Sequence, residues 1–155
     1  MKPRLLKDIK ISLTEIDKRE KLVNSKMLEL INSGARIVTY QSIMYGLTPM
    51  STPQFLLTSI VYEKVQAEEG QPVARKRFIK QVTTPLLEIE KRADTINQAC
   101  EALAEKGAKI VNFQDTVFGM TPAFAPQYLV TDIIYEADEE ISIEASVVPA
   151  PSKKK

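Results

Sequence analysis

The chain has 155 residues, of which 44% are hydrophobic, and this composition is sufficient for a buried core. Its 21 basic and 20 acidic residues nearly cancel, which excludes the large positive field that drives sequence-independent binding to nucleic acid. With no histidine and one cysteine, Cys100, the chain provides no zinc site, no histidine-assisted nucleophile and no intrachain disulfide. We therefore expect a non-enzymatic protein without a catalytic residue, a metal or a cofactor.

The N-terminal residues lack the pattern of a signal peptide, because lysine and aspartate interrupt the apolar residues. No apolar run approaches the length of about 18 residues that a membrane span requires. We expect a cytoplasmic protein that has no membrane partner.

The same sequence occurs twice along the chain, at an offset of 73 residues. The stretch GARIVTYQSIMYGLTPMSTPQFLLTSIVYE from Gly34 returns as GAKIVNFQDTVFGMTPAFAPQYLVTDIIYE from Gly107, with 15 of 30 positions identical. Between Arg4 and Ser33 only 9 of 30 positions match, so the second half of each unit is the more constrained. The domain organisation that we predict is a first unit over 1–66, a linker over 67–76, a second unit over 77–140 and a C-terminal extension over 141–155 that is largely disordered.

The first unit opens with a segment of strand character. Residues 4–11 alternate in the period of two that is typical of a strand. Ser12 and Glu15 then have the capping-box spacing that predicts the start of a helix, and Gly34 stands where a left-handed helix C-cap is expected. Two runs rich in β-branched and aromatic residues follow, separated by a loop with two prolines, so the unit is predicted to be β-α-β-β.

The second unit repeats this order with other helix-start residues. There Thr84 is expected to cap the helix while Pro85 occupies its first position, and Gly107 is the C-cap. The run ISIEAS after Glu140 predicts one further short strand. The predicted fold is therefore α+β, a tandem duplication of a βαββ unit in which each antiparallel sheet is covered by one helix. A lone unit leaves apolar surface and sheet edges bare, so we expect the two units to pair about a pseudo-twofold axis.

Residues whose character is kept in both copies are the candidates for a binding site. Neighbouring strand residues point to opposite faces, so Val38, Tyr40 and Met44 are expected toward the core. The opposite face is then predicted to carry Ile37, Thr39, Gln41, Ile43 and Tyr45. The motif G-[LM]-T-P-x-x-x-P-Q also occurs twice in loops. The predicted ligand-binding residues are Arg36, Tyr40, Gln41, Thr48 and Gln54 in the first unit and Lys109, Phe113, Gln114, Thr121 and Gln127 in the second.

Each candidate also has a structural interpretation. The half-polar strand face is also explained by burial against the other unit or another protomer, which is the interpretation that we favour. The loop residues are explained equally by capping of a neighbouring strand. Glu63 and Glu136 are interpreted as strand-end charges that face solvent rather than as a pair of catalytic acids. The basic residues near the helix starts, Lys18, Arg19, Lys21, Lys91 and Arg92, are interpreted as solvated helix faces, and Cys100 as a small core residue.

The order helix, glycine, KIVNF, loop, YLVTDIIYE resembles the small βαββ proteins of sporulation-associated and phage-encoded families. The topology is also similar to that of dodecin, a flavin-storage protein that assembles into a shell, although this chain has no tryptophan to stack on a flavin. The resemblance implies a βαββ fold and leaves the function open. Separately, we expect the chain to form a homo-oligomer.

The function that we predict is binding or sequestering of a small anionic, nucleotide-like ligand at matched sites between the two repeats, as in a phage protein that sequesters a signalling nucleotide. Two alternatives remain open. One is binding of single-stranded nucleic acid by the open sheet face, with Tyr45 and Phe118 stacking on bases. The other is a structural role in which the chain forms homo-oligomers without a small ligand.

Overall fold

The computed structural model describes residues 3–45, 55–64, 75–119 and 127–143, and both units have the predicted order of elements. Unit 1 contains β1 (Arg4–Ser12), the 3-10 helix η1 (Leu13–Lys18), α1 (Arg19–Asn32), β2 (Ala35–Tyr45) and β3 (Phe55–Lys64). Unit 2 contains β4 (Lys76–Pro85), the 3-10 helix η2 (Leu86–Lys91), α2 (Arg92–Glu105), β5 (Lys109–Gly119) and β6 (Gln127–Ala137). Among these described elements, no helix is long and apolar enough to cross a membrane.

Each unit forms a three-stranded antiparallel sheet whose central strand is the last strand of the unit. The order is β1-β3-β2 in sheet 1 and β4-β6-β5 in sheet 2. The registers match across the 73-residue offset, since Ile9 lies opposite Thr58 in sheet 1 and Val82 lies opposite Thr131 in sheet 2. The α+β class and the antiparallel sheets are confirmed, and the arrangement is compatible with a tandem repeat.

A bulge changes the side-chain alternation in the second strand of each unit. In β2 the pairing with β3 shifts between Ile37 and Thr39, so Val38 is an extra residue. Because the bulge reverses the alternation on its N-terminal side, Ile37 points into the same core as Tyr40. The prediction that Ile37 lies on the face opposite Tyr40 is therefore wrong. The same shift occurs in β5 between Ile110 and Asn112.

The glycine C-caps are confirmed. Gly34 and Gly107 have φ of 97° and 95°, in the left-handed region that favours glycine. Their amides donate to the carbonyl oxygens of Ile31 and Ala104 at 3.0 Å, which closes the last turn of each helix.

The helix starts differ from the prediction. A 3-10 helix stands between the strand and the α-helix in both units, so α1 begins at Arg19, and its N-cap residue Lys18 makes no side-chain capping bond. In unit 2, Pro85 is the last residue of β4, with ψ of 140°, and it precedes the first helical turn. The hydroxyl of Thr84 is buried and has no hydrogen-bond partner among the described residues, so the expected cap is wrong.

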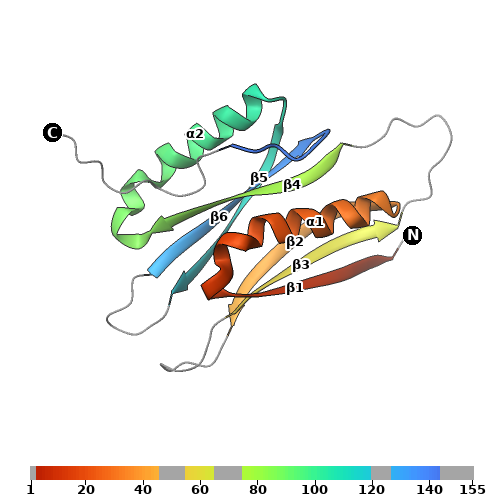
Figure 1. Ribbon diagram of the computed structural model, residues 1–155, viewed down its shortest axis with the longest axis horizontal. Coiled ribbons are helices and arrows are strands. Elements are labelled where there is room, and N and C mark those ends of the chain that lie inside the picture. The colour runs from red at the N-terminus through yellow and green to blue at the C-terminus, as the bar shows by residue number, and fades with distance from the viewer. Residues whose placement is uncertain (1–2, 46–54, 65–74, 120–126, 144–155) are drawn as a thin grey trace.

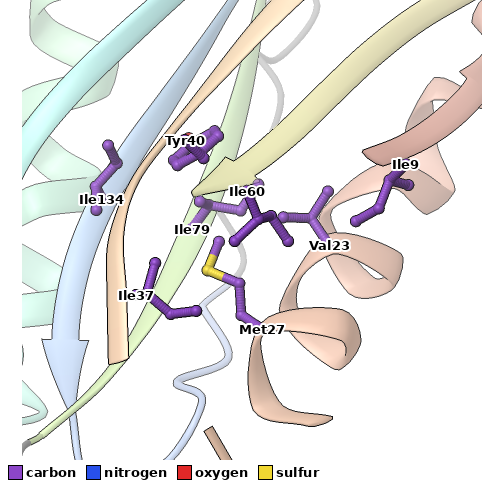
Figure 2. Packing of buried hydrophobic residues seen from close by; sticks show 8 residues of the cluster. All are labelled: Ile9, Val23, Met27, Ile37, Tyr40, Ile60, Ile79 and Ile134. Carbon is purple, nitrogen blue, oxygen red and sulfur yellow. The ribbon is translucent and has the colours of Figure 1, made fainter. Parts of the chain in front are cut away.

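The two units stack in a head-to-tail order rather than about a twofold axis. Figure 1 shows α1 over sheet 1 and beside β4, whereas α2 lies over the other face of sheet 2. We call the face of each sheet that points away from the helix of its own unit the outer face. Residues of both units form the central cluster that Figure 2 shows: Ile9, Val23, Met27, Ile37, Tyr40, Ile60, Ile79 and Ile134.

Equivalent positions show that this stacking is one-sided. Ile79 on the outer face of sheet 2 is fully buried, whereas Leu6, its equivalent in sheet 1, is 58% exposed. A twofold axis would bury both residues alike, so the predicted pseudo-twofold pairing is wrong. Unit 1 covers sheet 2 opposite α2, and thus sheet 2 is buried on both faces, whereas the outer face of sheet 1 leaves Leu6 and Ile43 each 58% exposed.

The first residues of the C-terminal extension pack against unit 2, and the three that the structure describes are not in the expected strand. Residues 141–143 have no regular secondary structure. The hydroxyl of Tyr135 accepts from the amide of Ile141 at 2.9 Å, and Lys80 donates to the carbonyl oxygen of Ile143 at 3.0 Å. Ile141 and Ile143 also pack against the unit 2 core. The linker residues 67–74 and the tail from residue 144 lie outside the described residues.

Candidate functional site

The junction between the units is built around the buried guanidinium of Arg19 at the start of α1. Its Nη1 and Nη2 donate to the two carboxylate oxygens of Asp132 at 2.7 and 2.6 Å, and Nη1 also donates to Oε1 of Gln81 at 2.7 Å. Within unit 1, Nε donates to Thr58 at 3.2 Å and Nη2 to Ser42 at 2.9 Å. One side chain of unit 1 is thereby locked onto two strands of unit 2, and the interpretation of Arg19 as solvated is wrong.

The charges at this junction are paired in a site without water access. The side chains of Arg19 and Asp132 are 1% and 2% exposed. Burial by itself lowers the pKa of Arg19, but the attraction of Asp132 outweighs it, so the pKa is raised and the guanidinium stays charged. Burial, followed by the charge of Asp132, raises the pKa of Tyr40 well above its usual value, and the phenol stays neutral. Although the Tyr40 hydroxyl lies beside both charges, it forms no hydrogen bond of standard geometry.

Side chains of α1 also complete the hydrogen bonds of the edge strand β4. The amide of Asn24 donates to the carbonyl oxygen of Ile79 at 2.9 Å and accepts from the Ile79 amide at 2.7 Å. Glu20 accepts from the amide of Gln81 at 2.7 Å. These contacts replace a neighbouring strand, because they satisfy backbone groups that an edge strand otherwise leaves unpaired.

The two sheets carry a matched row of charged residues near the start of the first strand. In sheet 1 the register places Arg4 and Arg36 on either side of Glu63, and the three form ion pairs of 3.5 and 2.5 Å. The hydrogen bond from Arg36, together with the charges of Arg36 and Arg4, lowers the pKa of Glu63 despite its burial. Glu63 is therefore a buried, paired carboxylate, and the interpretation of it as a solvated strand-end charge is wrong.

The equivalent row in sheet 2 consists of Arg77, Glu136 and Lys109. Glu136 lies opposite both cations in the sheet register and pairs with Nε of Arg77 at 3.1 Å. Arg77 also donates to the carbonyl oxygen of Val38 in unit 1 at 2.9 Å. Each row thus combines two cationic side chains with one carboxylate and has a net positive charge.

The structure brings together some of the predicted ligand-binding residues and separates others. Gln114 donates to the carbonyl oxygen of Tyr40, which joins the two units, and Arg36 lies in the charged row of sheet 1. Tyr40 is buried, whereas its counterpart Phe113 is 45% exposed. Gln41 and Lys109 are exposed. Thr48, Gln54 and Thr121 lie outside the described residues, and of Gln127 only the backbone, as the first residue of β6, is described.

Two hollows lie along the junction between the units. A cavity of about 230 Å³ is lined by residues of both units, including Tyr40 and Val38 from unit 1 and Arg77 and Asn112 from unit 2. A groove of about 530 Å³ lies between the start of α1 and β4. The groove is lined by Asp17, Glu20, Lys21, Lys80, Gln81 and Glu140, among others. Its acidic residues outnumber its lysines, so the smaller cavity beside Arg77 is the better match for an anion.

Sequence reasoning missed the residues that join the units. Asp132 stands where the other copy has Ser59, and this difference was a signal that the surroundings of the two positions differ. Asp115, which replaces Ser42, gave no such signal. In the structure Asp132 binds Arg19 across the junction, whereas Asp115 binds Arg92 within unit 2. Cys100 packs against the unit 2 core, as predicted, and burial raises the pKa of its thiol.

The described residues contain no group of three or more histidine, cysteine, aspartate or glutamate side chains placed to hold a metal ion. Comparison of the chain with family models, with curated proteins and with solved structures gave no match. The resemblance to sporulation-associated and phage-encoded families stays a prediction.

Proposed function

We propose that this protein is a non-enzymatic binding protein that takes a small anionic, nucleotide-like ligand at matched positions of its two repeats. The observation that carries the proposal is the charged row that recurs at the same register in both sheets, with Arg4, Glu63 and Arg36 in one and Arg77, Glu136 and Lys109 in the other. A repeat that retains three charged residues at one sheet register is better explained by a shared task than by general solubility.

The row of sheet 1 is chemically suited to a phosphate group. The side chains of Arg4 and Arg36 are 65% and 59% exposed, so most of their N–H donors face solvent. The fork of donors in a guanidinium matches phosphate oxygens, and a second cation next to it increases the attraction. The adjacent outer face adds the exposed amide of Gln41, which can hydrogen-bond to the base of a nucleotide.

The row of sheet 2 supports the same ligand class between the repeats. Arg77 lines the 230 Å³ cavity, in which Thr39 and Asn112 provide further polar groups and Tyr40 an aromatic wall. This volume is below the range of about 300–1,000 Å³ that is usual for sites enclosing a whole small molecule. We therefore expect the cavity to hold the anionic end of a ligand whose remainder lies outside.

Calorimetric titration with a panel of nucleoside monophosphates and linear and cyclic dinucleotides, with inorganic phosphate as the reference, tests the proposal. Removing a charged hydrogen-bonding group costs about 1.5–3 kcal/mol, so Arg36→Ala should weaken binding about tenfold or more. Lys26→Ala is the matched control, because Lys26 forms an exposed ion pair on α1, away from both rows. No heat with any compound, together with no nucleotide released from the heat-treated protein, contradicts the proposal.

A structural role is the second candidate, and the uncovered outer face of sheet 1 favours it. This face exposes Leu6 and Ile43, each 58% accessible. The counterpart of Leu6 in sheet 2, Ile79, is fully buried against unit 1, so self-association is a specific expectation.

A further inference from the structure

The stacking order of the chain has two open ends. From one end to the other the layers are α2, sheet 2, α1 and sheet 1, and within the described chain nothing covers the outer face of sheet 1. We propose that a second copy of this chain covers that face with its α2 and β5, and that this contact repeats between chains the junction that α1 and β2 form with sheet 2 inside the chain. The proposal does not depend on a small ligand.

The edge strand β1 offers the backbone groups that β4 offers inside the chain. Leu6 is the repeat equivalent of Ile79 and has the same register against the central strand of its sheet. Ile79 is bound at its amide and carbonyl by Asn24, whereas no described residue binds the outward amide and carbonyl of Leu6. The equivalent of Asn24 is Asn97, which is exposed on α2. Asn97 of one copy therefore fits the free edge of β1 in the next.

The guanidinium of Arg92 is only half engaged. Its Nε donates to Thr131 at 3.1 Å and its Nη2 to Asp115 at 2.5 Å, the positions at which Arg19 binds Thr58 and Ser42. Arg19 also donates to unit 2 through both Nη1 and Nη2, whereas Nη1 of Arg92 has no partner among the described residues. Arg92 is thus positioned to bind a further acceptor at the start of α2.

Charge complementarity indicates what that acceptor is. Inside the chain, Arg19 meets Gln81 on β4 and Asp132 on the central strand. The equivalents on sheet 1 are Asp8 and Ser59, which bond to each other at 2.6 Å. The carboxylate is on the central strand in sheet 2 and on the edge strand in sheet 1. Both the junction inside the chain and the proposed contact between copies therefore offer one carboxylate and one polar neighbour to one arginine. Random surface divergence gives no reason for this exchange.

Apolar surfaces are complementary at the same contact. Inside the chain, the ring of Tyr40 on β2 is buried against Ile79 and Ile134 of unit 2. Its counterpart Phe113 on β5 is 45% exposed, and the counterparts of the two isoleucines are the exposed Leu6 and the half-buried Val61. The contact between copies thereby buries two large apolar side chains, Leu6 and Phe113, that lie exposed at opposite ends of the stack of layers.

One contact is not repeated between chains. Glu20, which binds the amide of Gln81 and pairs with Lys80, is replaced by Ala93 in α2. The contact between copies is therefore weaker than the junction inside the chain. Because donor and acceptor surfaces differ, the contact is heterologous, and it builds a closed ring or an open head-to-tail chain rather than a twofold dimer.

Two variants each block one of the two surfaces of the proposed contact, the acceptor face on sheet 1 or the donor face on α2 and β5. Leu6→Arg blocks the acceptor face, and Phe113→Glu blocks the donor face. Asp8→Lys is a second acceptor variant, since Asp8 is exposed and its substitution leaves the core intact. Leu22→Arg is the control, because it charges a partly exposed leucine on α1 outside both surfaces. Circular dichroism and thermal unfolding establish that each variant is folded.

Size-exclusion chromatography coupled to light scattering, at about 100 μM chain, measures the mass of the assemblies that each variant forms. We expect the wild type and Leu22→Arg to form assemblies of several chains, and each blocked variant alone to have the chain mass of 17.4 kDa. An equimolar mixture of Leu6→Arg and Phe113→Glu should give twice that mass, since each chain retains the surface that the other lacks. A monomeric wild type, a mixture that stays monomeric, or a wild-type dimer that Phe113→Glu leaves intact overturns the proposal.

Discussion

Neutralising Asp132 tests whether the two units are held together by a buried charge pair. In Asp132→Asn the shape of the side chain is kept, and Arg19 retains its bonds to Gln81, Thr58 and Ser42. The guanidinium, however, loses the carboxylate of Asp132 in a site that water does not reach. Breaking a buried pair by removing one partner costs about 3–5 kcal/mol. A domain of this kind has a total stability of about 5–15 kcal/mol, so the loss is a large fraction of it.

The repeat provides a matched control for this variant. Arg92 and Asp115 form the equivalent pair in unit 2, but their side chains are 27% and 45% exposed. An exposed ion pair contributes about 0–1 kcal/mol, so Asp115→Asn should have a small effect. The free energy of unfolding is measured by urea denaturation followed by circular dichroism. All variants are measured in a chain that also carries Leu6→Arg, which we expect to be monomeric, so that self-association does not contribute to the measured stability.

A double variant distinguishes the charge from the packing. Replacing both Arg19 and Asp132 by apolar residues, as in Arg19→Met with Asp132→Leu, removes the unpaired charge, so it should be less destabilising than Asp132→Asn alone. Equal losses for Asp132→Asn and Asp115→Asn, or a loss below about 1 kcal/mol for Asp132→Asn, refute the inference that burial of this pair joins the units.

Three further predictions concern single side chains. Asn24→Ala should lower the free energy of unfolding by at least about 2 kcal/mol, because it leaves the buried amide and carbonyl of Ile79 unpaired, whereas Asn97→Ala in a monomeric background should change it by less than about 0.5 kcal/mol; urea denaturation measures both. Gly107→Ala should cost about 1–2 kcal/mol through its φ of 95° alone, since an added Cβ meets no atom within 4 Å, and an unchanged thermal midpoint contradicts this. Burial raises the pKa of Tyr135 to about 12, so the stability from its neutral phenol is complete below pH 10 and is lost as pH rises through 12; the decline between these values should be smaller in Tyr135→Phe.

The local structure of each unit was predictable because it depends on neighbouring residues. The glycines at 34 and 107 predicted the helix ends, since a left-handed C-cap requires a residue without a Cβ. Alternating and β-branched runs predicted the strands, and the 73-residue offset predicted that both units share one order of elements. The helix starts were predicted less well, because a 3-10 turn separates the strand from the α-helix in both units.

The candidate site was predictable only in part. Arg36 and Lys109 were identified because their charge is kept in both copies, and the structure places each beside a glutamate of the central strand. Their partners Arg4 and Arg77 were missed, because the residues are far apart in the chain and only strand pairing brings them together. Tyr40 was predicted to face the core, yet its burial beside Arg19 and Asp132 depends on contacts between units.

The sequence by itself determined that the chain consists of two alike βαββ units, because helices and strands follow from local periodicity and from turn residues. Only the tertiary structure decided that the units stack head to tail, with Arg19 buried across the junction and Leu6 left exposed. The physical reason is that two similar surfaces allow either a symmetric or a one-sided contact. The choice between them depends on single complementary pairs, such as Arg19 with Asp132 and Asn24 with the edge of β4, whose distance in the chain hides them from any local pattern.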